Sequence, residues 1–301
     1  MIENFSFEPF TLRCGGRLLQ YDRPALMGIL NATPDSFYDG GRYQSEKQIV
    51  ERAEQIVAEG ADIVDIGVVS SRPGATLLPP DDEARRLAAA VAAVRRSLPE
   101  AVISVDTCYA LPARAAVDAG ADIVNDIGGG AFDAAMFDTI AEMGVPYILM
   151  LNPFGAPDDP TGRNRTSQYS QGDPVALAVS TLSSTVAQLR EKGVADVIID
   201  PGFGFSKTME QNYQLLAHLS DLRRLFPTCP LLVALSRKSM IYKPLGITPG
   251  EALSGTTALH AVALMKGANI LRVHDVKDAV QTVSVMSELT SDENRNRYIT
   301  K

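Results

Sequence analysis

The sequence holds few of the residues that build metal centres and disulfide frameworks. It contains three cysteines and three histidines in 301 residues. Cys14, Cys108 and Cys229 lie far apart, are odd in number and show no metal-ligand spacing. We therefore expect reduced thiols in a cytoplasmic protein, with no disulfide framework and no histidine-rich zinc site.

An excess of positive charge is missing as well. Lysine and arginine number 28 against 36 aspartates and glutamates, which gives a net charge of −8. Proteins that bind nucleic acids or membrane surfaces through electrostatics need a basic face, so we expect neither partner. A local cluster of cations around a small anionic ligand is still compatible with this charge balance.

Long apolar runs are also absent. No stretch reaches 18 uninterrupted apolar residues, and the start of the chain shows no basic segment followed by an apolar one. We therefore expect no membrane span and no signal peptide. Apolar residues still make up 46% of the chain, which is enough for a full hydrophobic core.

A short motif repeats along the chain. Residues 60–67 read GADIVDIG and residues 120–128 read GADIVNDIG, while weaker copies begin at Gly193 and Gly267. In each copy a glycine fits the left-handed residue that ends a helix, and a short apolar strand follows. Strands that are apolar on both faces are typical of a parallel sheet covered by helices.

Eight strands are expected in the sequence, with helical segments between nearly all of them. They lie near residues 26–31, 62–66, 102–105, 123–127, 146–151, 196–199, 231–235 and 269–273. Eight alternating β and α units predict an α/β fold of the (β/α)8 TIM-barrel type, in a single domain with the barrel over about 25–290. An open doubly wound sheet is the alternative, which the lack of a Gly-x-Gly-x-x-Gly motif after the first strand disfavours.

Three segments outside this pattern carry predictions of their own. Residues 5–24 are expected to form a short N-terminal β-hairpin with a turn at Gly15-Gly16, which caps the bottom of the barrel. Residues 152–173 form a long polar loop of the kind that serves as a lid or binding loop. Residues 291–301 are expected to be a frayed tail.

Polar residues follow the expected strands at the end where TIM barrels hold their active sites. Asp106, Asn125 and Asp200 could together read the N–H groups of a flat heterocycle. Asn31 is a neutral oxygen ligand that suits Mg²⁺ beside a diphosphate. A further set carries positive charge or can acquire it, and suits phosphate oxygens: Arg72, Lys238, Arg272 and His274. The mouth is therefore predicted to hold a polar heterocycle with a phosphorylated leaving group.

Other polar residues receive a structural interpretation. His218 and His260 lie within expected helices, and we expect neither to act in the site. We expect Lys207 and Arg237 to be solvated rather than to contact substrate directly.

The motifs at the strand ends together resemble the dihydropteroate synthase family. Residues 27–37 (MGILNATPDSF) resemble its first signature and residues 70–75 (SSRPGA) its second. Later signatures are matched in the same order by residues 104–107, 125–127, 200–205, 236–239 and 272–276. Seven motifs in register over roughly residues 26–285 are far more specific than any one of them.

This resemblance implies a (β/α)8 barrel that acts as a cytoplasmic homodimer in folate biosynthesis. The implied transferase condenses 6-hydroxymethyl-7,8-dihydropterin diphosphate with 4-aminobenzoate, with the help of Mg²⁺, and yields 7,8-dihydropteroate and diphosphate. Sulfonamides act on this family, and the fit around Ser71 and the first two loops decides sensitivity.

The resemblance also implies a role for each matched residue. The pterin is held by Asp106, Asn125, Asp200 and Lys238, with Met150 packed beside it. Diphosphate and metal are held by Asn31, Arg72, Arg272 and His274. The 4-aminobenzoate site is completed by Asp35, Phe37, Ser71 and Pro73, and is lined from the other side by Phe205, Lys238 and Ser239. The residues expected to take part in catalysis are Asp35, Asp200, Lys238, Arg272 and His274.

The sequence departs from the family pattern in three places, and two alternatives to the family's activity stay open. Residues 67–71 read GVVSS where many members have Gly-Gly-Glu-Ser-Thr, and residues 151–157 replace a His-Met stretch followed by Gly-Thr-Pro. Ser206 replaces a glycine often seen before Lys207. A pterin-binding paralogue without catalysis is one alternative. A corrinoid methyltransferase domain that binds a pterin is the other, and it would not need the cluster of cations.

Overall fold

Strands and helices alternate along the chain, as the sequence pattern predicts. The computed structural model describes residues 7–32, 41–69, 78–152 and 172–289, without the side chains of residues 41–45. The strands are β1 (Phe10–Cys14), β2 (Arg17–Tyr21), β3 (Ala25–Asn31), β4 (Ile63–Gly67), β5 (Val102–Asp106), β6 (Ile123–Asp126), β7 (Tyr147–Met150), β8 (Val197–Asp200), β9 (Leu232–Val233) and β10 (Ile270–Val273). The α-helices are α1 (Gly41–Ala58), α2 (Pro80–Ser97), α3 (Ala110–Asp118), α4 (Met136–Met143), α5 (Pro174–Glu191), α6 (Met209–Ala217), α7 (Leu219–Leu225), α8 (Ser239–Leu245), α9 (Leu253–Met265) and α10 (Val276–Glu288).

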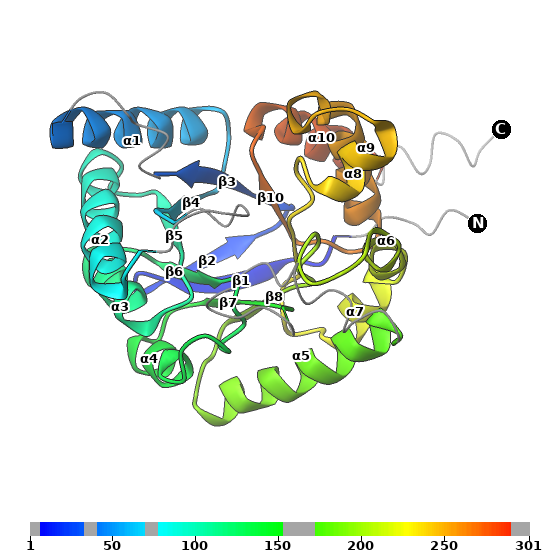
Figure 1. Cartoon of the computed structure of the whole chain (residues 1–301), viewed down its shortest axis with the longest axis horizontal. Helices are drawn as coiled ribbons and strands as arrows, with labels where there is room; N and C mark the ends of the chain where they lie inside the picture. Colours follow the sequence, from blue (N-terminus) through cyan, green and yellow to red (C-terminus); the bar gives the residue numbers. More distant parts are fainter. Residues whose placement is uncertain (1–6, 33–40, 70–77, 153–171, 290–301) are drawn as a thin grey trace.

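The strands β3 to β10 form one parallel sheet that closes on itself. Their order is β8-β7-β6-β5-β4-β3-β10-β9. The two ends of this order meet where Ile199 and Leu231 form a parallel bridge, and the Ile199 amide donates to the Pro230 carbonyl at 3.0 Å. The helices form a ring around the strands (Figure 1). Closure confirms the predicted TIM barrel and excludes the open doubly wound sheet.

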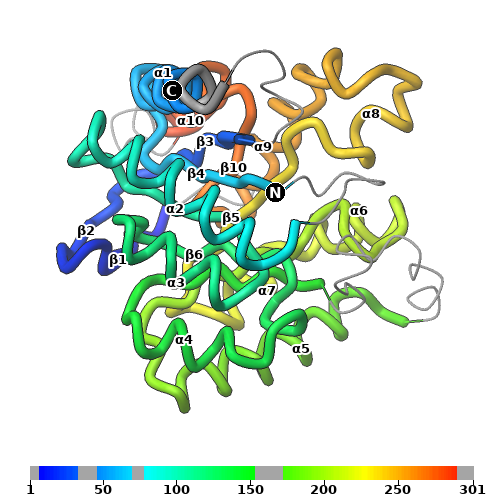
Figure 2. Tube along the Cα trace, turned by 60° about the vertical axis from the view of Figure 1, so that its left-hand side comes forward, coloured from blue at the N-terminus to red at the C-terminus, as the bar shows by residue number. Residues whose placement is uncertain are grey.

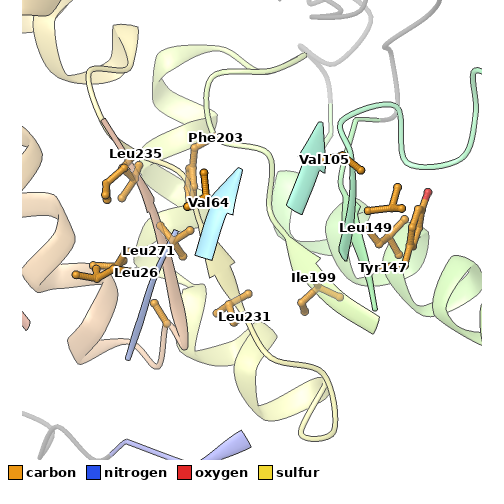
Figure 3. Packing of buried hydrophobic residues seen from close by; sticks show 14 of the residues in the cluster. Leu26, Val64, Val105, Tyr147, Leu149, Ile199, Phe203, Leu231, Leu235 and Leu271 are labelled. Carbon is orange, nitrogen blue, oxygen red and sulfur yellow. The ribbon is translucent and has the colours of Figure 1, made fainter. Parts of the chain in front are cut away.

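Side chains alternate between the inside and the outside of the barrel, because successive residues of a strand point to opposite faces. Leu26 and Val64 point outward and pack in the larger core cluster, between strands and helices (Figure 3). Met27 and Ile63 point inward and belong to a smaller cluster inside the barrel. Both faces of each strand are therefore apolar at its start, which is the origin of the apolar runs in the repeat.

The repeat and the helix caps behave as the sequence indicates. Gly60 and Gly120 have φ of 104° and 110°, a region that favours glycine after a helix. Asp173 caps α5 by accepting from the Val175 amide at 2.9 Å. His218 follows α6 rather than lying inside a helix, and it bonds to Asp221 at 2.8 Å.

The hairpin β1–β2 closes the end of the barrel where the strands begin. Gly15 and Gly16 form its two-residue turn with φ of 55° and 77°, the left-handed pair that a type I′ turn needs. Leu12 and Cys14 are 0% exposed and pack in the inner cluster with strand residues such as Met27. The prediction of a capping hairpin is confirmed, and Figure 2 shows it on the side of the barrel opposite α8.

We expect Leu12→Ala to lower the free energy of unfolding by about 2–5 kcal/mol, because it removes a fully buried side chain from the inner cluster. Leu18→Ala is the matched control, since Leu18 lies in the same hairpin and is 71% exposed. Its effect should stay within about 0.5 kcal/mol. Urea unfolding measures both variants, and equal small losses would mean that the hairpin is not part of the cooperative core.

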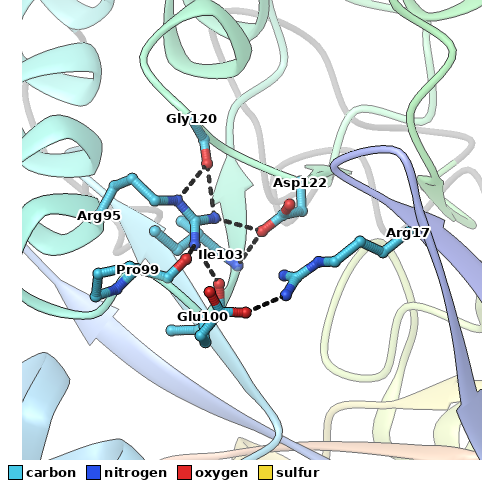
Figure 4. Close-up of polar contacts among 8 residues, drawn as sticks. Arg17, Arg95, Pro99, Glu100, Ile103, Gly120 and Asp122 are labelled. Atoms are coloured by element: carbon cyan, nitrogen blue, oxygen red, sulfur yellow. Dashed lines mark hydrogen bonds and ion pairs between the residues drawn. The ribbon is translucent and has the colours of Figure 1, made fainter.

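A polar cluster ties α2 to the same end of the barrel (Figure 4). The Arg95 guanidinium donates to the carbonyl oxygens of Gly120 and Ala101, at 2.8 and 2.6 Å, and to Asp122 Oδ2 at 2.6 Å. Asp122 Oδ2 also accepts from the Ile103 amide at 2.9 Å. These charges hold backbone groups in place, so the cluster has a structural role. Variants of Arg95 and Asp122 can therefore serve as controls for variants at the opposite end of the barrel.

The remaining sequence predictions concern single features. The three cysteines are buried and free, as expected. Among the described residues, no helix is long and apolar enough to cross a membrane. The tail 291–301 and residues 153–171 of the long loop lie outside the described residues. The single-domain assignment stays a prediction.

Candidate active site

The mouth of the barrel is built by the last inward-facing residues of the strands. Each lies two or four residues after an apolar member of the inner cluster, such as Met27 in β3 or Ile63 in β4. These mouth residues are Asn31, Asp65, Asp106, Asn125, Met150, Asp200 and Arg272. The alternation therefore brings predicted site residues from β3, β5, β6, β7, β8 and β10 to one place.

Arg272 bridges two carboxylates in this mouth. Its Nε donates to Asp65 Oδ2 at 2.7 Å, while its Nη2 lies 2.6 Å from the same oxygen and 2.9 Å from Asp106 Oδ2. Asn125 Nδ2 also donates to Asp65 Oδ2, at 3.2 Å. Arg272 is 16% exposed and Asp65 is fully buried, so solvent screens these ion pairs only weakly.

Asp65 is a site residue that the sequence analysis did not single out. Its position two residues after the inward-facing Ile63 is the signal that could have identified it. Its Oδ1 is buried without a hydrogen-bond partner among the described residues. Asp106 and Asn125, both predicted for the heterocycle, are thus connected to Arg272, predicted for the diphosphate, directly or through Asp65.

Burial raises the pKa of Asp106. Arg272 opposes this shift, whereas the negative charges of Asp65 and Glu83 reinforce it. Glu83 belongs to the first turn of α2, is itself buried, and accepts a hydrogen bond from the Thr107 hydroxyl. A second buried acid therefore lies next to the strand end at Asp106. Burial raises the pKa of Glu83 as well.

Asp200 ends β8 in a buried position with cations around it. Burial raises its pKa, and the shift is opposed by a hydrogen bond from the Gly202 amide at 2.8 Å. The charges of Lys238, Arg272 and Lys207 oppose the shift as well. The carboxylate is thus an acceptor whose ionisation depends on its cationic neighbours.

Lys238 and Phe205 lie against each other beside Asp200. The Lys238 Nζ is 4.3 Å from the centroid of the Phe205 ring, which is a cation–π distance. Gly204 has φ of 82°, and a Cβ there would lie 3.1 Å from Lys238 Cδ, so the glycine lets the loop pass close to the lysine. Helix α8 begins at Ser239, directly after Lys238, which is its N-cap residue.

His274 follows β10 and is held by Ser236. Its Nδ1 lies 3.0 Å from Ser236 Oγ, and its amide donates to the same oxygen at 3.2 Å. Burial and the charges of Arg272 and Arg237 lower the pKa of His274 to about 4. The imidazole is therefore neutral near pH 7.

We expect the His274 imidazole to titrate near pH 4 in NMR spectra of the folded protein. Since this pKa lies below the ordinary value of 6.5, the unfolded chain binds more protons between the two values, and the free energy of unfolding falls as pH drops through that window. Added diphosphate should raise the midpoint, because negative charge favours the imidazolium. A midpoint near 6.5 without diphosphate would contradict the buried environment.

Five predicted site residues lie outside the described residues. They are Asp35, Phe37, Ser71, Arg72 and Pro73. Their roles in the first two loops stay predictions, as do the ligand assignments of the mouth residues.

The structure corrects the expectation for Lys207 and adds an ion pair to that for Arg237. Lys207 is not solvated: it is 7% exposed, and its Nζ is buried without a hydrogen-bond partner in the described part of the chain. Arg237 is partly exposed, but its Nε and Nη2 bind Asp275 at 3.0 and 2.5 Å. In both loops the chain turns at a left-handed residue, Ser206 (φ 51°) or Arg237 itself (φ 56°), which sequence patterns do not reveal.

Two departures from the family pattern contact each other. Ser206 adopts a left-handed φ, which explains why a glycine often stands at this position. Its hydroxyl donates to Asn152 Oδ1, and Asn152 belongs to the altered segment 151–157. Asn152 Nδ2 in turn donates to the Ile127 carbonyl at 2.9 Å. The start of the altered loop is thus tied to the loops that follow β6 and β8.

Comparison with known proteins identifies the family. A family model described as pterin binding enzyme matches residues 27–274, which span the strands of the barrel from Met27 to His274. Dihydropteroate synthase of Escherichia coli is 38% identical over 289 residues, which cover 94% of this chain and 98% of that protein. The chain belongs to the dihydropteroate synthase family.

Other members of the family agree in sequence and in fold. The structure of Xanthomonas albilineans dihydropteroate synthase with 4-aminobenzoic acid superposes with a TM-score of 0.83 at 37% identity, covering 94% of this chain and 99% of that one. A probable bifunctional folylpolyglutamate synthase/dihydropteroate synthase of Haloferax volcanii is 41% identical over 266 residues. The alignment covers 88% of this chain but 30% of that longer relative.

Proposed function

We propose that the chain is a dihydropteroate synthase, a transferase of folate biosynthesis. It joins 6-hydroxymethyl-7,8-dihydropterin diphosphate to 4-aminobenzoate and releases 7,8-dihydropteroate and diphosphate. The observation that carries this proposal is the network in the mouth, where Arg272 links Asp65 and Asp106 while Asn125 donates to Asp65. The carboxylates and the amide of this network can bind N–H groups of a heterocycle, and its guanidinium can bind an anionic leaving group.

The pterin ring is proposed to bind among the acceptors of the mouth. Asp106 and Asp200 offer carboxylate oxygens to its amino and ring N–H groups, and Asn125 offers an amide that can donate and accept. Met150 ends β7 in a buried, inward-facing position, which suits packing against a flat ring. Hydrogen bonds from the ring to carboxylates are charge-assisted and therefore stronger than neutral ones.

The reaction separates charge, and the residues of the mouth suit that step. The bond between the pterin methylene and diphosphate breaks, its electron pair leaves with diphosphate, and positive charge develops on the pterin. Asp200 stabilises the cationic ring while Arg272 and His274 stabilise the leaving anion. The amine of 4-aminobenzoate then bonds to the methylene carbon, and the ammonium formed passes its proton to the departing diphosphate or to water. No residue has to act as a general base, because the attacking amine is neutral.

Magnesium is proposed to assist at Asn31. Asn31 ends β3, is exposed, and offers one amide oxygen at the mouth. The described residues hold no cluster of three histidine, cysteine or acidic side chains, which fits an ion held mainly by substrate phosphates and water. When bound, Mg²⁺ would neutralise charge on the leaving diphosphate.

The 4-aminobenzoate site is proposed to lie beside Phe205 and Lys238. The ring and the ammonium sit together at 4.3 Å, so an aromatic acid would meet both an apolar face and a cation there. The Ser239 amide at the start of α8 is a further donor for its carboxylate. The first two loops, with Asp35, Phe37, Ser71, Arg72 and Pro73, are proposed to close the site and exclude water.

We also propose a quaternary state and a cellular location for the protein. The resemblance to the family supports a homodimer that works in the cytoplasm, and three buried free cysteines are consistent with a reducing compartment.

The test of the proposed function is product formation. Purified chain is incubated with both substrates and Mg²⁺, and 7,8-dihydropteroate is measured by mass spectrometry. We expect product that disappears when a chelator removes the metal. Pterin binding without any product would instead support the non-catalytic paralogue.

A further inference from the structure

The chain segments that follow β7 and β8 stay in contact beyond the ends of their strands. The Leu151 amide donates to the Asp200 carbonyl at 2.8 Å. A Cβ on Gly202 would lie 2.3 Å from the Leu151 carbonyl oxygen, so a glycine lets the two backbones touch. Four residues later, the Ser206 hydroxyl donates to Asn152 Oδ1. The segment after β8 is therefore attached to residues 151–152 at two points, Gly202 and Ser206.

Phe205 lies between these two points of attachment. Its amide donates to the Gly202 carbonyl at 3.2 Å, and its buried ring lies 4.3 Å from the Lys238 Nζ. Ser206 follows Phe205 directly, so a hydrogen bond from Ser206 restrains the backbone that carries the ring. The position of the ring against Lys238 therefore depends on both attachments.

The contact between Ser206 and Asn152 is buried and has a further anchor. Ser206 is 1% exposed and Asn152 is 5% exposed, so solvent competes little for their hydrogen bond. Asn152 Nδ2 donates to the Ile127 carbonyl at 2.9 Å, which ties the asparagine to the loop after β6. A hydrogen bond anchored in this way can hold a neighbouring side chain in one position.

The backbone of Ser206 shows that its hydroxyl matters. Its φ of 51° lies in the left-handed region, where a residue with a Cβ is less stable than glycine. Glycine is also the residue often seen at this position in the family pattern, and Asn152 belongs to the segment 151–157 that departs from that pattern as well. The two departures meet in one hydrogen bond, which a glycine could not donate.

We propose that Asn152 and Ser206 are a positioning pair that holds the Phe205 ring in place for 4-aminobenzoate. The inference rests on the proposed function, in which this acid lies beside Phe205 and Lys238. The pair acts through the aromatic ring and touches neither substrate. It should therefore set the affinity for 4-aminobenzoate and leave the chemical step and the binding of the pterin diphosphate nearly unchanged.

The first test compares Ser206→Ala with Ser206→Gly in the full chain, because both variants lose the hydroxyl. We expect the KM for 4-aminobenzoate to rise roughly tenfold in each, the scale of one lost hydrogen bond. The turnover number and the KM for pterin diphosphate should change by less than about twofold. Steady-state kinetics with each substrate varied in turn measures this split.

Thermal unfolding of the same two variants separates positioning from stability. Glycine adopts the left-handed φ without strain, so Ser206→Gly should unfold at a Tm roughly 2–4 °C above that of Ser206→Ala. A merely structural role would make the KM for 4-aminobenzoate follow the Tm, whereas the pair predicts equal KM values at unequal Tm.

Thr282→Val is the matched control. Thr282 is 7% exposed, and its hydroxyl donates to the Asp278 carbonyl at 2.9 Å within α10. This variant also loses a buried hydroxyl, but away from the loops after β7 and β8. Its Tm should fall, and both KM values should stay at those of wild type.

The second test asks whether the two residues act as a unit. Asn152→Ala should also raise the KM for 4-aminobenzoate, and the double variant with Ser206→Ala should be no worse than about the weaker-binding single variant. Two effects that multiply would show independent residues and overturn the pair.

The remaining outcomes separate this inference from the proposed function. An unchanged KM for 4-aminobenzoate in folded Ser206→Ala, or an equal rise in the KM of both substrates, overturns the positioning role while product formation still supports the function. If Ser206→Ala does not fold, Ser206→Gly decides, because it keeps the backbone unstrained. Failure of wild type to form dihydropteroate overturns the proposed function, and the inference with it.

Discussion

Replacement of Arg272 by alanine is expected to lower the turnover number for dihydropteroate formation by roughly 10²–10³, the scale for removing one donor that stabilises developing charge. The guanidinium lies at 2.6–2.9 Å from Asp65 and Asp106, so it holds two acceptors of the mouth while facing the place proposed for the diphosphate. Steady-state kinetics measures the loss, which should fall mainly on turnover.

The same variant should lose stability as well, because Asp65 is fully buried and would lose its ion-pair partner. We expect the free energy of unfolding to fall by about 3–5 kcal/mol. Arg272→Lys keeps a charge without the two-pronged geometry and should retain the fold with intermediate turnover. Arg95→Ala is the matched control at the other end of the barrel, where Arg95 binds Asp122, and it should cost stability without lowering turnover. Wild-type turnover in folded Arg272→Ala contradicts the assignment of this residue.

Asp106→Asn is expected to weaken pterin binding by roughly 10–100-fold, the range for a lost hydrogen bond to a charged group. The shape of the side chain is kept, and Arg272 retains its pair with Asp65, so the fold should survive. Calorimetry with the pterin measures the change, and turnover at saturating pterin should change less than affinity does.

Asp122→Asn is the matched control for this variant. Asp122 is also a buried aspartate paired with an arginine, but it lies at the hairpin end of the barrel. It should reduce stability and leave pterin affinity unchanged. If Asp106→Asn binds pterin as tightly as wild type, the heterocycle does not bind at this strand end.

The fold could be predicted because it repeats. Each unit carries the same signals, a glycine after a helix and then a short strand apolar on both faces, and eight such units have few alternatives to a closed barrel. The hairpin was predicted for a similarly local reason, since a turn at Gly15-Gly16 constrains the two strands beside it.

The site could be predicted only where its residues end strands and match motifs. Asp65 was missed because it contributes through a contact with Arg272, 207 positions away in the sequence. Lys207 was misjudged because its burial depends on the left-handed turn at Ser206. The hydrogen bond from Ser206 to Asn152 joins residues 54 positions apart, so no local pattern indicates that these two departures belong together.

The most direct test of the whole account is diphosphate release, measured with purified protein, pterin diphosphate and Mg²⁺, with and without 4-aminobenzoate. We expect release that is strongly accelerated by 4-aminobenzoate and matched mole for mole by 7,8-dihydropteroate. Tight binding of the pterin diphosphate with no release under either condition would contradict it, and would mark the chain as a pterin-binding relative that no longer catalyses the reaction.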